Sequence, residues 1–419
     1  MQKLFTEFTA TTAAQWKEQL VKDLKGIDYN TLVWKTNSGI EVQPFYTHEN
    51  LNNSPSPIFT KSDWAICETI FATDAKTANA QALNALRNGA SGLVFHITHK
   101  TDFSILLNEV LLQYIYTLFV VPPEFEKELA VFLSSISVGD NCFVECDTTL
   151  NGKVELHSTS SICMSTNLYQ ESGSNTINEL AFSIAHLNEY LNIAPSSITT
   201  IHLNVSVGGD FFMEIAKLRA LRKLINFLLN EYKLTANIHI HAQTTSINKS
   251  VVDSYNNMLR STTEAMSASI GGANSIAVLP FDLEFNPQND FSSRMARNQQ
   301  LILKDESYLN KVADMAAGSY YIETLTETLC EKSWEQFKVI ESKGGILASL
   351  KSNYIQESIS KDAEALIKQF KEGKLVLVGV NKFQNKNEGV NVAKRKNNVH
   401  PSGIKTINLS ESLEQAIAN

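Results

Sequence analysis

The feature that most constrains the fold of this chain is an alternation of short β-branched or aromatic runs with longer segments of helical period, starting near residue 64. Several of the short runs are apolar almost throughout, which is typical of parallel strands covered on both faces. Eight such strands separated by helices favour an α/β fold with a closed (β/α)8 TIM barrel, and an open doubly wound sheet remains the alternative. We predict strands at residues 64–71, 92–97, 116–121, 142–147, 161–166, 199–207, 237–244 and 275–281.

Several helix starts are also marked in the sequence. Asp210 is placed to cap a long helix whose apolar residues fall on one stripe. Thr176-x-x-Glu179 and Ser250-x-x-Asp253 are typical of capping boxes, so we expect helices to begin at these points. The segment between residues 147 and 161 is too short for a full helix, and the barrel pattern is weakest there.

Three further regions lie outside the predicted barrel of residues 61–307. Residues 1–60 form an arm with one helix around residues 13–25 and a Ser-Pro turn cluster at 54–57. Residues 308–381 form a helical extension in which Gly344 and Gly345 break the helical pattern. Residues 382–419 are polar and lose their periodicity, so we expect a loosely ordered, linker-like tail, whose basic trio at 394–396 is a solvated surface feature.

Composition excludes several classes of function. The formal net charge is −8, so the chain has no global basic field for nucleic acid or an anionic membrane. The longest apolar stretch, residues 111–123, is shorter than the ~20 residues of a membrane span. No signal peptide is visible, and the 5 scattered cysteines suggest reduced thiols, so we expect a cytoplasmic protein. Its partner should therefore be a small molecule or another protein.

His239-x-His241 is the sharpest local motif. On a strand, residues two apart point to the same face, so both imidazoles could meet one metal ion. A barrel-type metal hydrolase is one hypothesis on this basis. It would need further histidines from later strand ends, and none follows residue 244 on those strands, which favours a structural role or a single-ligand role. Dinucleotide, phosphate-loop and nucleophile-elbow motifs are absent from the sequence.

Longer runs carry a more specific signal than any of these motifs. They are R-S-T-T-E-A-M at 260–266, D-F-S-S-R-M-A-R-N-Q at 290–299, A-G-S-Y-Y at 317–321 and V-G-V-N-K-F-Q at 378–384, supported by 211–220 and 253–257. In this order the chain resembles the methylmalonyl-CoA mutase family from about residue 34 to residue 384. The resemblance implies a substrate barrel that works with adenosylcobalamin. The family's cobalamin-domain motif D-x-H-x-x-G, whose histidine ligates cobalt, does not occur here.

The resemblance also identifies positions where this chain departs from the family. The family's first-strand sequence R-P-W-T-I-R-Q-Y places its two arginines at Ser62 and Cys67 and its tyrosine at Thr69. Leu168 stands where the family has the histidine that hydrogen-bonds the substrate thioester, and Leu283 replaces a glutamate that meets the adenosyl ribose. A leucine can neither donate a hydrogen bond nor move a proton. The residues that we expect in a remnant pocket are Gln170, Glu171, Arg219, His241 and Gln243.

This pattern resembles the small, non-catalytic subunit of a heterodimeric mutase, in a short form that lacks the cobalamin domain. It implies no catalytic residue, no metal and no cofactor on this chain, with adenosylcobalamin and CoA esters bound by a homologous large subunit. An alternative is a catalytic barrel whose cobalamin domain is on a separate chain, against which Leu168, Thr69, Cys67 and Leu283 argue. We expect His241, Gln243 and Glu171 in the lumen or at the carboxyl ends of the strands. The arm should contact the partner through Leu32, Val33, Trp34, Phe45 and Tyr46.

Overall fold

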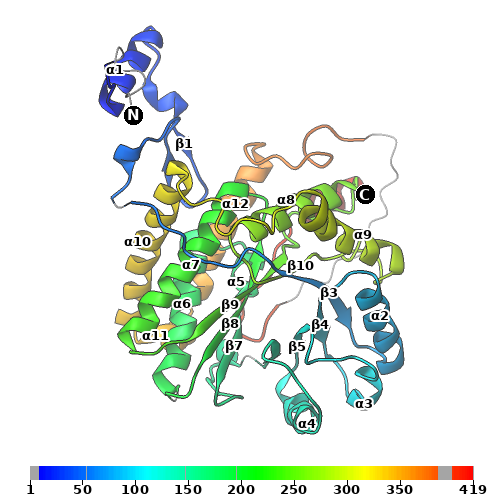
Figure 1. Cartoon of the computed structure of the whole chain (residues 1–419). Coiled ribbons are helices and arrows are strands. Elements are labelled where there is room, and N and C mark those ends of the chain that lie inside the picture. Colours follow the sequence, from blue (N-terminus) through cyan, green and yellow to red (C-terminus); the bar gives the residue numbers. More distant parts are fainter. Residues whose placement is uncertain (1–8, 53, 147, 195, 386–398, 419) are drawn as a thin grey trace, which may run out of the picture.

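Eight parallel strands form the centre of the computed structural model, which describes residues 9–52, 54–146, 148–194, 196–385 and 399–418 (Figure 1). The strand order is β6-β5-β4-β3-β10-β9-β8-β7, so the first and last strands of the barrel pair with each other. The predicted (β/α)8 TIM barrel is therefore confirmed and the open sheet is excluded. The strands are β3 (Ala65–Phe71), β4 (Gly92–His96), β5 (Tyr116–Val120), β6 (Cys142–Glu145), β7 (Ser161–Ser165), β8 (Thr200–Val207), β9 (Asn237–Thr244) and β10 (Ser275–Ala277).

The barrel has one seam, between β6 and β7. No ladder pairing joins these two strands within the described residues, although the other neighbours in the barrel are paired. In its described residues, the connection between β6 and β7 has the short 3-10 turn Thr149–Asn151 where other connections have a helix. This is the segment whose length is too short for a full helix, so the sequence identifies the weak point of the barrel correctly.

Helices surround the strands on the outside (Figure 1). They are α2 (Ala75–Arg87), α3 (Phe103–Leu106), α4 (Pro123–Ser134), α5 (Asn167–Glu171), α6 (Thr176–Ile193), α7 (Phe211–Glu231), α8 (Asn256–Ile270) and α9 (Asp290–Leu301), which a π-helix, Ile302–Glu306, continues. Asp210 caps α7 as predicted, because its side chain accepts a hydrogen bond from the Met213 amide. α6 begins at Thr176 as predicted, although its cap residue differs, and the other predicted helix start is wrong. Asn175 caps α6 in place of Thr176, and α8 begins at Asn256 and not near Ser250.

The misplaced start of α8 has a clear cause. The Ser250 amide donates to Asn257 Oδ1 at 3.0 Å, and Asn257 Nδ2 donates back to the Ser250 carbonyl oxygen at 2.7 Å. Asn257 Nδ2 also donates to the Phe281 carbonyl oxygen at 3.0 Å, on the loop after β10. These bonds hold residues 245–255 as a loop over the barrel. The loop backbone is therefore satisfied by side-chain hydrogen bonds and not by a helix.

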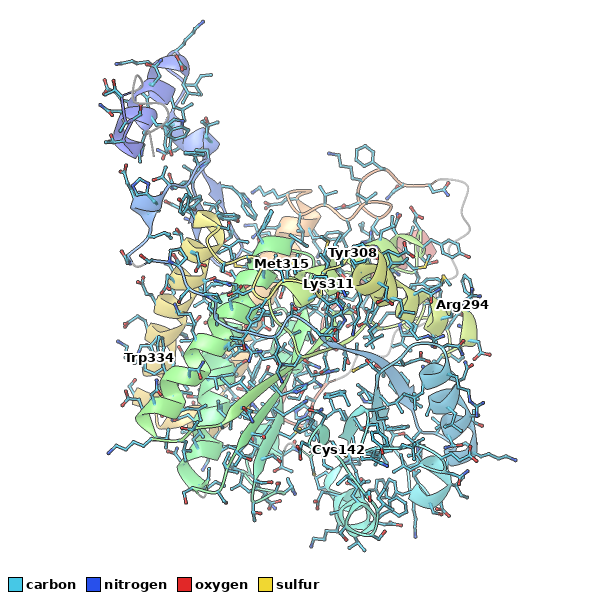
Figure 2. All side chains as sticks on the ribbon, in the orientation of Figure 1. Cys142, Arg294, Tyr308, Lys311, Met315 and Trp334 are labelled. Atoms are coloured by element: carbon cyan, nitrogen blue, oxygen red, sulfur yellow. The ribbon has the colours of Figure 1, made fainter. Side chains whose placement is uncertain are left out.

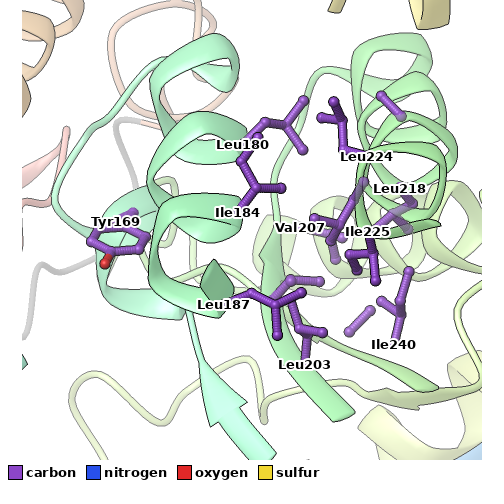
Figure 3. Close-up of a cluster of buried hydrophobic side chains, with 14 of the residues drawn as sticks. Tyr169, Leu180, Ile184, Leu187, Leu203, Val207, Leu218, Leu224, Ile225 and Ile240 are labelled. Atoms are coloured by element: carbon purple, nitrogen blue, oxygen red, sulfur yellow. The ribbon is translucent and has the colours of Figure 1, made fainter. Parts of the chain in front are cut away.

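The main hydrophobic core lies between the strands and the helices α6 and α7 (Figure 3). Its side chains come from the outward faces of β8 and β9 and from the inward stripes of both helices, and they are almost fully buried. Burying each such Leu or Ile side chain contributes about 1.5–3 kcal/mol to folding. The residues labelled in this core include Leu180, Ile184 and Leu187 of α6, Leu218, Leu224 and Ile225 of α7, Leu203 and Val207 of β8, and Ile240 of β9.

The helical extension packs on the outside of α6 and α7. It comprises α10 (Tyr320–Ser342), α11 (Gly345–Lys351) and α12 (Tyr354–Lys371), and α10 lies along both α6 and α7 (Figure 1). The predicted break is present, since Gly344 and Gly345 have φ angles of 93° and 83°. None of the described helices is long and apolar enough to cross a lipid bilayer.

The two ends of the chain behave differently. The arm contains α1 (Ala13–Asp23) and the two-stranded sheet β1 (Trp34–Lys35) and β2 (Glu41–Val42), and α1 buries none of its residues. Figure 1 shows the arm projecting from the barrel. The prediction of a loosely ordered tail is wrong for residues 399–415, which pack on the barrel. The last helix, α13 (Glu411–Ala418), begins in this segment. The basic trio at 394–396 lies outside the described residues. The division into arm, barrel, extension and tail as domains stays a prediction.

Candidate functional site

The middle of the barrel lumen is filled by stacked rings. The Tyr116 ring stacks on His239 and His241, with ring centroids 5.0 Å and 5.5 Å apart. The Tyr116 hydroxyl lies 2.9 Å from His202 Nε2. Ser275 Oγ lies 3.0 Å from His239 Nε2 and 2.8 Å from His241 Nδ1. Because alternate residues of each strand face inward, these side chains meet although they come from four different strands.

Burial keeps these histidines neutral. It lowers the pKa of His239 and of His241 to about 3 each, and it lowers the pKa of His202 well below its usual value. Among the described residues, no group of three or more His, Cys, Asp and Glu side chains could hold a metal ion. The lumen places His239 and His241 on the same face, as their spacing predicts. Among the described residues, the lumen supplies no third side chain that could bind a metal ion together with His239 and His241, as the metal-hydrolase hypothesis requires.

The carboxyl-end mouth above this layer holds the polar residues of the predicted pocket. Gln170 Nε2 donates to Glu214 Oε1 at 3.0 Å, and the Glu171 carboxylate accepts from Ser206 Oγ at 2.9 Å and from the Ser246 amide at 3.1 Å. The β8–β9 register sets Ser206 opposite Gln243. The structure therefore brings Gln170, Glu171 and Gln243 to the same end of the lumen.

His241 lies one inward position deeper than Gln243. It is opposite Asn204 in the register and is fully buried. Its Nε2 atom has no hydrogen-bond partner among the described residues. The lumen position that we expected for His241 is present in the structure.

Arg219 is the exception among the predicted pocket residues. It lies on α7, on the face toward the extension, where its guanidinium is fully buried and pairs with Asp314 and Glu323. The guanidinium donates to Glu323 Oε1 at 2.7 Å. The expectation that Arg219 lines the pocket is wrong, because the helix turns this residue away from the lumen. Its ion pairs hold α10 and the preceding segment against α7.

The positions where the chain departs from the family's residues are also covered. Thr69 is 2% exposed, and Gln288 Nε2 donates to its carbonyl oxygen at 2.6 Å. Gln288 belongs to the loop between β10 and α9, which an ion pair between Glu68 and Arg297 on α9 holds near β3. Leu168 on α5 packs at the edge of the main core. Leu168 offers a ligand no hydrogen-bonding or ionisable group in place of the family's histidine. Thr69 offers only its hydroxyl in place of the family's tyrosine.

Sequence reasoning missed a group of buried charges behind the mouth. Lys217 is 1% exposed, and its Nζ lies 2.9 Å from Glu179 Oε1, 2.7 Å from Glu214 Oε2 and 2.8 Å from the Ser206 carbonyl oxygen. Burial raises the pKa of Glu179 to about 7, although Lys217 opposes that shift. Burial alone would lower the pKa of Lys217, but the two carboxylates raise it. The i,i+3 spacing of Glu214 and Lys217 is the one sequence signal for this group.

Figure 2 draws the described side chains on the ribbon and labels several sulfur-containing, charged and aromatic residues. Tyr308, Lys311 and Met315 lie on the segment between α9 and α10, and Trp334 lies on α10. Cys142 lies on β6 at the seam. Inward-facing polar side chains from several strands gather in the lumen and at its mouth.

Comparison with known proteins identifies this architecture. The family model described as methylmalonyl-CoA mutase matches residues 144–414. A protein from Porphyromonas gingivalis named methylmalonyl-CoA mutase small subunit is 30% identical over 92% of this chain and 71% of that protein. The chain belongs to the methylmalonyl-CoA mutase family.

Other mutases match over shorter stretches. A small subunit from Streptomyces virginiae is 33% identical over 51% of this chain and 36% of its own length. A large subunit from Propionibacterium freudenreichii is 32% identical over 52% of this chain and 32% of its own length. The chain therefore spans only about a third of these two mutases.

Proposed function

We propose that this chain is the small, non-catalytic subunit of a heterodimeric methylmalonyl-CoA mutase, an isomerase that interconverts methylmalonyl-CoA and succinyl-CoA in the cytoplasm. The observation that carries the proposal is the state of the family's catalytic positions. Thr69 is buried and its carbonyl oxygen is bonded to Gln288, and Leu168 is partly buried at the edge of the main core. Adenosylcobalamin and the CoA ester would be bound by the large subunit, and no residue of this chain would be catalytic.

The exposed apolar residues of the arm support a partner contact. Trp34 is 52% exposed, Phe45 is 53% exposed and Leu32 is 39% exposed. An arm that leaves such side chains in water gains little by folding alone, so a partner surface is the natural place to bury them. Val33 and Tyr46 are partly buried, and Tyr46 packs on Tyr321 at 5.3 Å. We therefore narrow the proposed contact to Leu32, Trp34 and Phe45, while Tyr46 holds the arm to α10 of the helical extension.

Co-expression with the large mutase chain of the same organism tests the assembly. We expect a one-to-one complex by size-exclusion chromatography with light scattering, with a total buried area on the order of 2,000 Å². Trp34→Ser with Phe45→Ser should weaken the complex at least tenfold and leave the fold of the chain intact. Val131→Ser, at an exposed apolar position on α4, is the matched control. A chain that stays monomeric beside its large subunit at micromolar concentration contradicts the proposal.

A turnover assay tests the non-catalytic part. The isolated chain, supplied with adenosylcobalamin and methylmalonyl-CoA, should form no succinyl-CoA above a control without protein. Turnover that appears only after a separate cobalamin domain is added would instead favour the catalytic-barrel alternative. Activity in the complex and none in the isolated chain is the result that we expect.

A further inference from the structure

The segment that follows residue 398 returns to the barrel and hydrogen-bonds to its loops. The Ile407 amide donates to the Glu171 carbonyl oxygen at 2.9 Å, and the Leu409 amide donates to the Ile247 carbonyl oxygen at 2.9 Å. Asn408 Nδ2 donates to the carbonyl oxygens of Ser246 and Lys249, each at 2.8 Å. The segment therefore bridges α5, which follows β7, and the loop that follows β9.

Apolar side chains anchor the same segment. Leu409 is 5% exposed and packs in a small core with Ile247, Phe370, Leu377 and Val380. Ile404 is 2% exposed and joins the main core. This small core joins the loop after β9 to α12 and to the turn that follows α12. If the segment left the barrel, Leu409 and Ile404 would be exposed to water. Burial of these two side chains therefore favours the docked position of the segment.

A buried carboxylate fixes the end of the segment. Glu414 is 3% exposed, and its Oε1 atom accepts from Ser250 Oγ at 2.8 Å and from the Val251 amide at 3.1 Å. Ser410 Oγ also donates to this oxygen. A carboxylate is buried at low cost only where such donors meet it. These partners therefore specify one docked position for the segment.

The contacts lie at the carboxyl ends of the strands, the face on which TIM barrels place their active sites. Residues 407–414 hydrogen-bond to α5 after β7 and to the loop after β9, and Gln288, on the loop after β10, donates to the Thr69 carbonyl oxygen on β3. Some of the polar groups at this face are engaged by the chain itself, whereas Gln170 Oε1 and the Thr69 hydroxyl have no hydrogen-bond partner among the described residues. Glu171 is bonded to Ser206 and Ser246, and Lys249 is paired with Glu264 at 2.8 Å. A ligand that approaches the ends of β7 and β9 would have to displace these contacts.

We propose that residues 404–414 form a built-in plug that closes the carboxyl-end mouth of this barrel against cobalamin and CoA esters. The choice of cobalamin and CoA esters as the excluded ligands rests on the proposed function, whereas the docked position of residues 404–414 does not. The plug replaces ligand contacts with contacts of the chain itself. Loss of the family's ligand-binding residues and closure of the mouth would then both prevent binding of cobalamin and CoA esters. The contacts of the plug would also stabilise the barrel without a ligand.

Hydrogen exchange followed by mass spectrometry tests the plug on the full-length chain. The wild-type amides of residues 246–251 and 407–414 should be protected. Leu409→Asp and Glu414→Gln should each increase exchange in both segments at least tenfold, while β8 peptides stay unchanged. Lys405→Ala, at an exposed position on the same segment, is the matched control. Unchanged protection in both variants, or fast exchange in the wild type, overturns the plug. Unchanged β8 exchange separates release of the plug from global unfolding.

Ligand titration completes the test. Hydroxocobalamin and methylmalonyl-CoA, each titrated into the isolated wild-type chain, should produce no binding heat and no change in exchange at residues 246–251. Binding of either ligand that alters exchange in this segment overturns the proposal. Both measurements use the isolated chain, so a failure of the plug leaves the heterodimer test unaffected. Failure of the heterodimer in turn leaves the exchange result valid.

Discussion

At the scale of single residues, the lumen histidines show how a barrel interior changes ordinary chemistry. His241 is the histidine that the family resemblance places in the pocket, yet Tyr116 and Ser275 hold both His241 and His239 in a packed layer. Burial lowers their pKa values to about 3. These imidazoles therefore stabilise the fold as neutral groups, and their protonation opposes folding.

The first prediction concerns acid stability. A histidine whose pKa is lowered in the folded state contributes stability above its unfolded pKa of about 6.5, and that contribution is lost as the pH falls toward the folded value. His241→Asn should therefore make the free energy of unfolding less dependent on pH. We expect the loss between pH 7 and pH 5 to be smaller than in the wild type by about 2 kcal/mol, in urea titrations at both pH values. His48→Asn, at an exposed position in the arm, is the matched control for the loss of a histidine.

Buried ion pairs provide a second prediction. Lys249 is 5% exposed and Glu264 is fully buried, and they pair at 2.8 Å beneath the loop after β9. Lys249→Met should destabilise the chain by about 3–5 kcal/mol because it leaves an unpaired buried carboxylate. The double variant Lys249→Met with Glu264→Gln should recover most of that loss. Lys338→Met removes the exposed pair with Glu335 and should cost about 1 kcal/mol or less. Equal losses at the two sites would contradict this account.

At the scale of elements, the end of α8 shows how one helix terminus joins the arm to the barrel. Gly272 follows α8 with a φ of +87°, and a Cβ added there would lie 2.4 Å from the Phe59 ring. Phe59 packs near Arg222, which donates to the Gly272 carbonyl oxygen at 2.9 Å. The segment that leads into β3 therefore lies directly against Gly272. A larger residue at this position would fit only if the Phe59 ring moved.

The third prediction compares two glycines of the same conformation. Gly318 has a φ of +86° and no atom within 4 Å of an added Cβ, so Gly318→Ala measures the backbone strain alone. Gly272→Ala adds the clash with Phe59. Thermal and urea unfolding should show a further cost of about 1–3 kcal/mol for Gly272→Ala. Phe59→Ala combined with Gly272→Ala should remove that further cost.

At the scale of the whole molecule, the barrel is least continuous at its seam. β6 pairs with β5 but not with β7 in the described chain, and a cleft of about 190 Å³ lies there, lined by residues that include Cys142 and Cys163. Cys163 Sγ lies 3.3 Å from His202 Nδ1, so one side of the seam is tied to the lumen layer. The other strands each have two neighbours in the sheet. The seam should therefore open more readily than the rest of the barrel.

The fourth prediction follows from this asymmetry. Native-state hydrogen exchange should give amides of β6 exchange rates at least tenfold faster than those of β8, which pairs on both sides with β7 and β9. β5, one strand further from the seam, is the internal control and should fall between them. Uniform protection across the three strands would indicate that the side chains close the seam as firmly as a ladder does.

Local pattern was sufficient for much of this fold. The eight predicted strands are all present. They could be predicted because the spacing of apolar residues along a short segment indicates whether it is a buried strand or a helix with one buried face. The last strand ends at Ala277, earlier than predicted, and Pro280 cannot donate to a ladder. The spacing of His239 and His241 likewise predicted that both lie on one face of the strand, and the structure shows that this face is the lumen. Loss of the family's charged and aromatic groups at Cys67 and Thr69 is visible in the sequence itself.

Only the tertiary structure decided the features that depend on contacts distant in the chain. Arg219 turns toward Asp314 and Glu323, and no local signal distinguishes that face of α7 from the one toward the strands. The polar composition of the tail predicts disorder, yet Leu409 and Glu414 find partners more than 150 residues away. A sequence determines which segments must be buried. Which surface buries them, and whether the mouth of the barrel stays open, depends on shape and on hydrogen-bond partners that only the folded chain brings together.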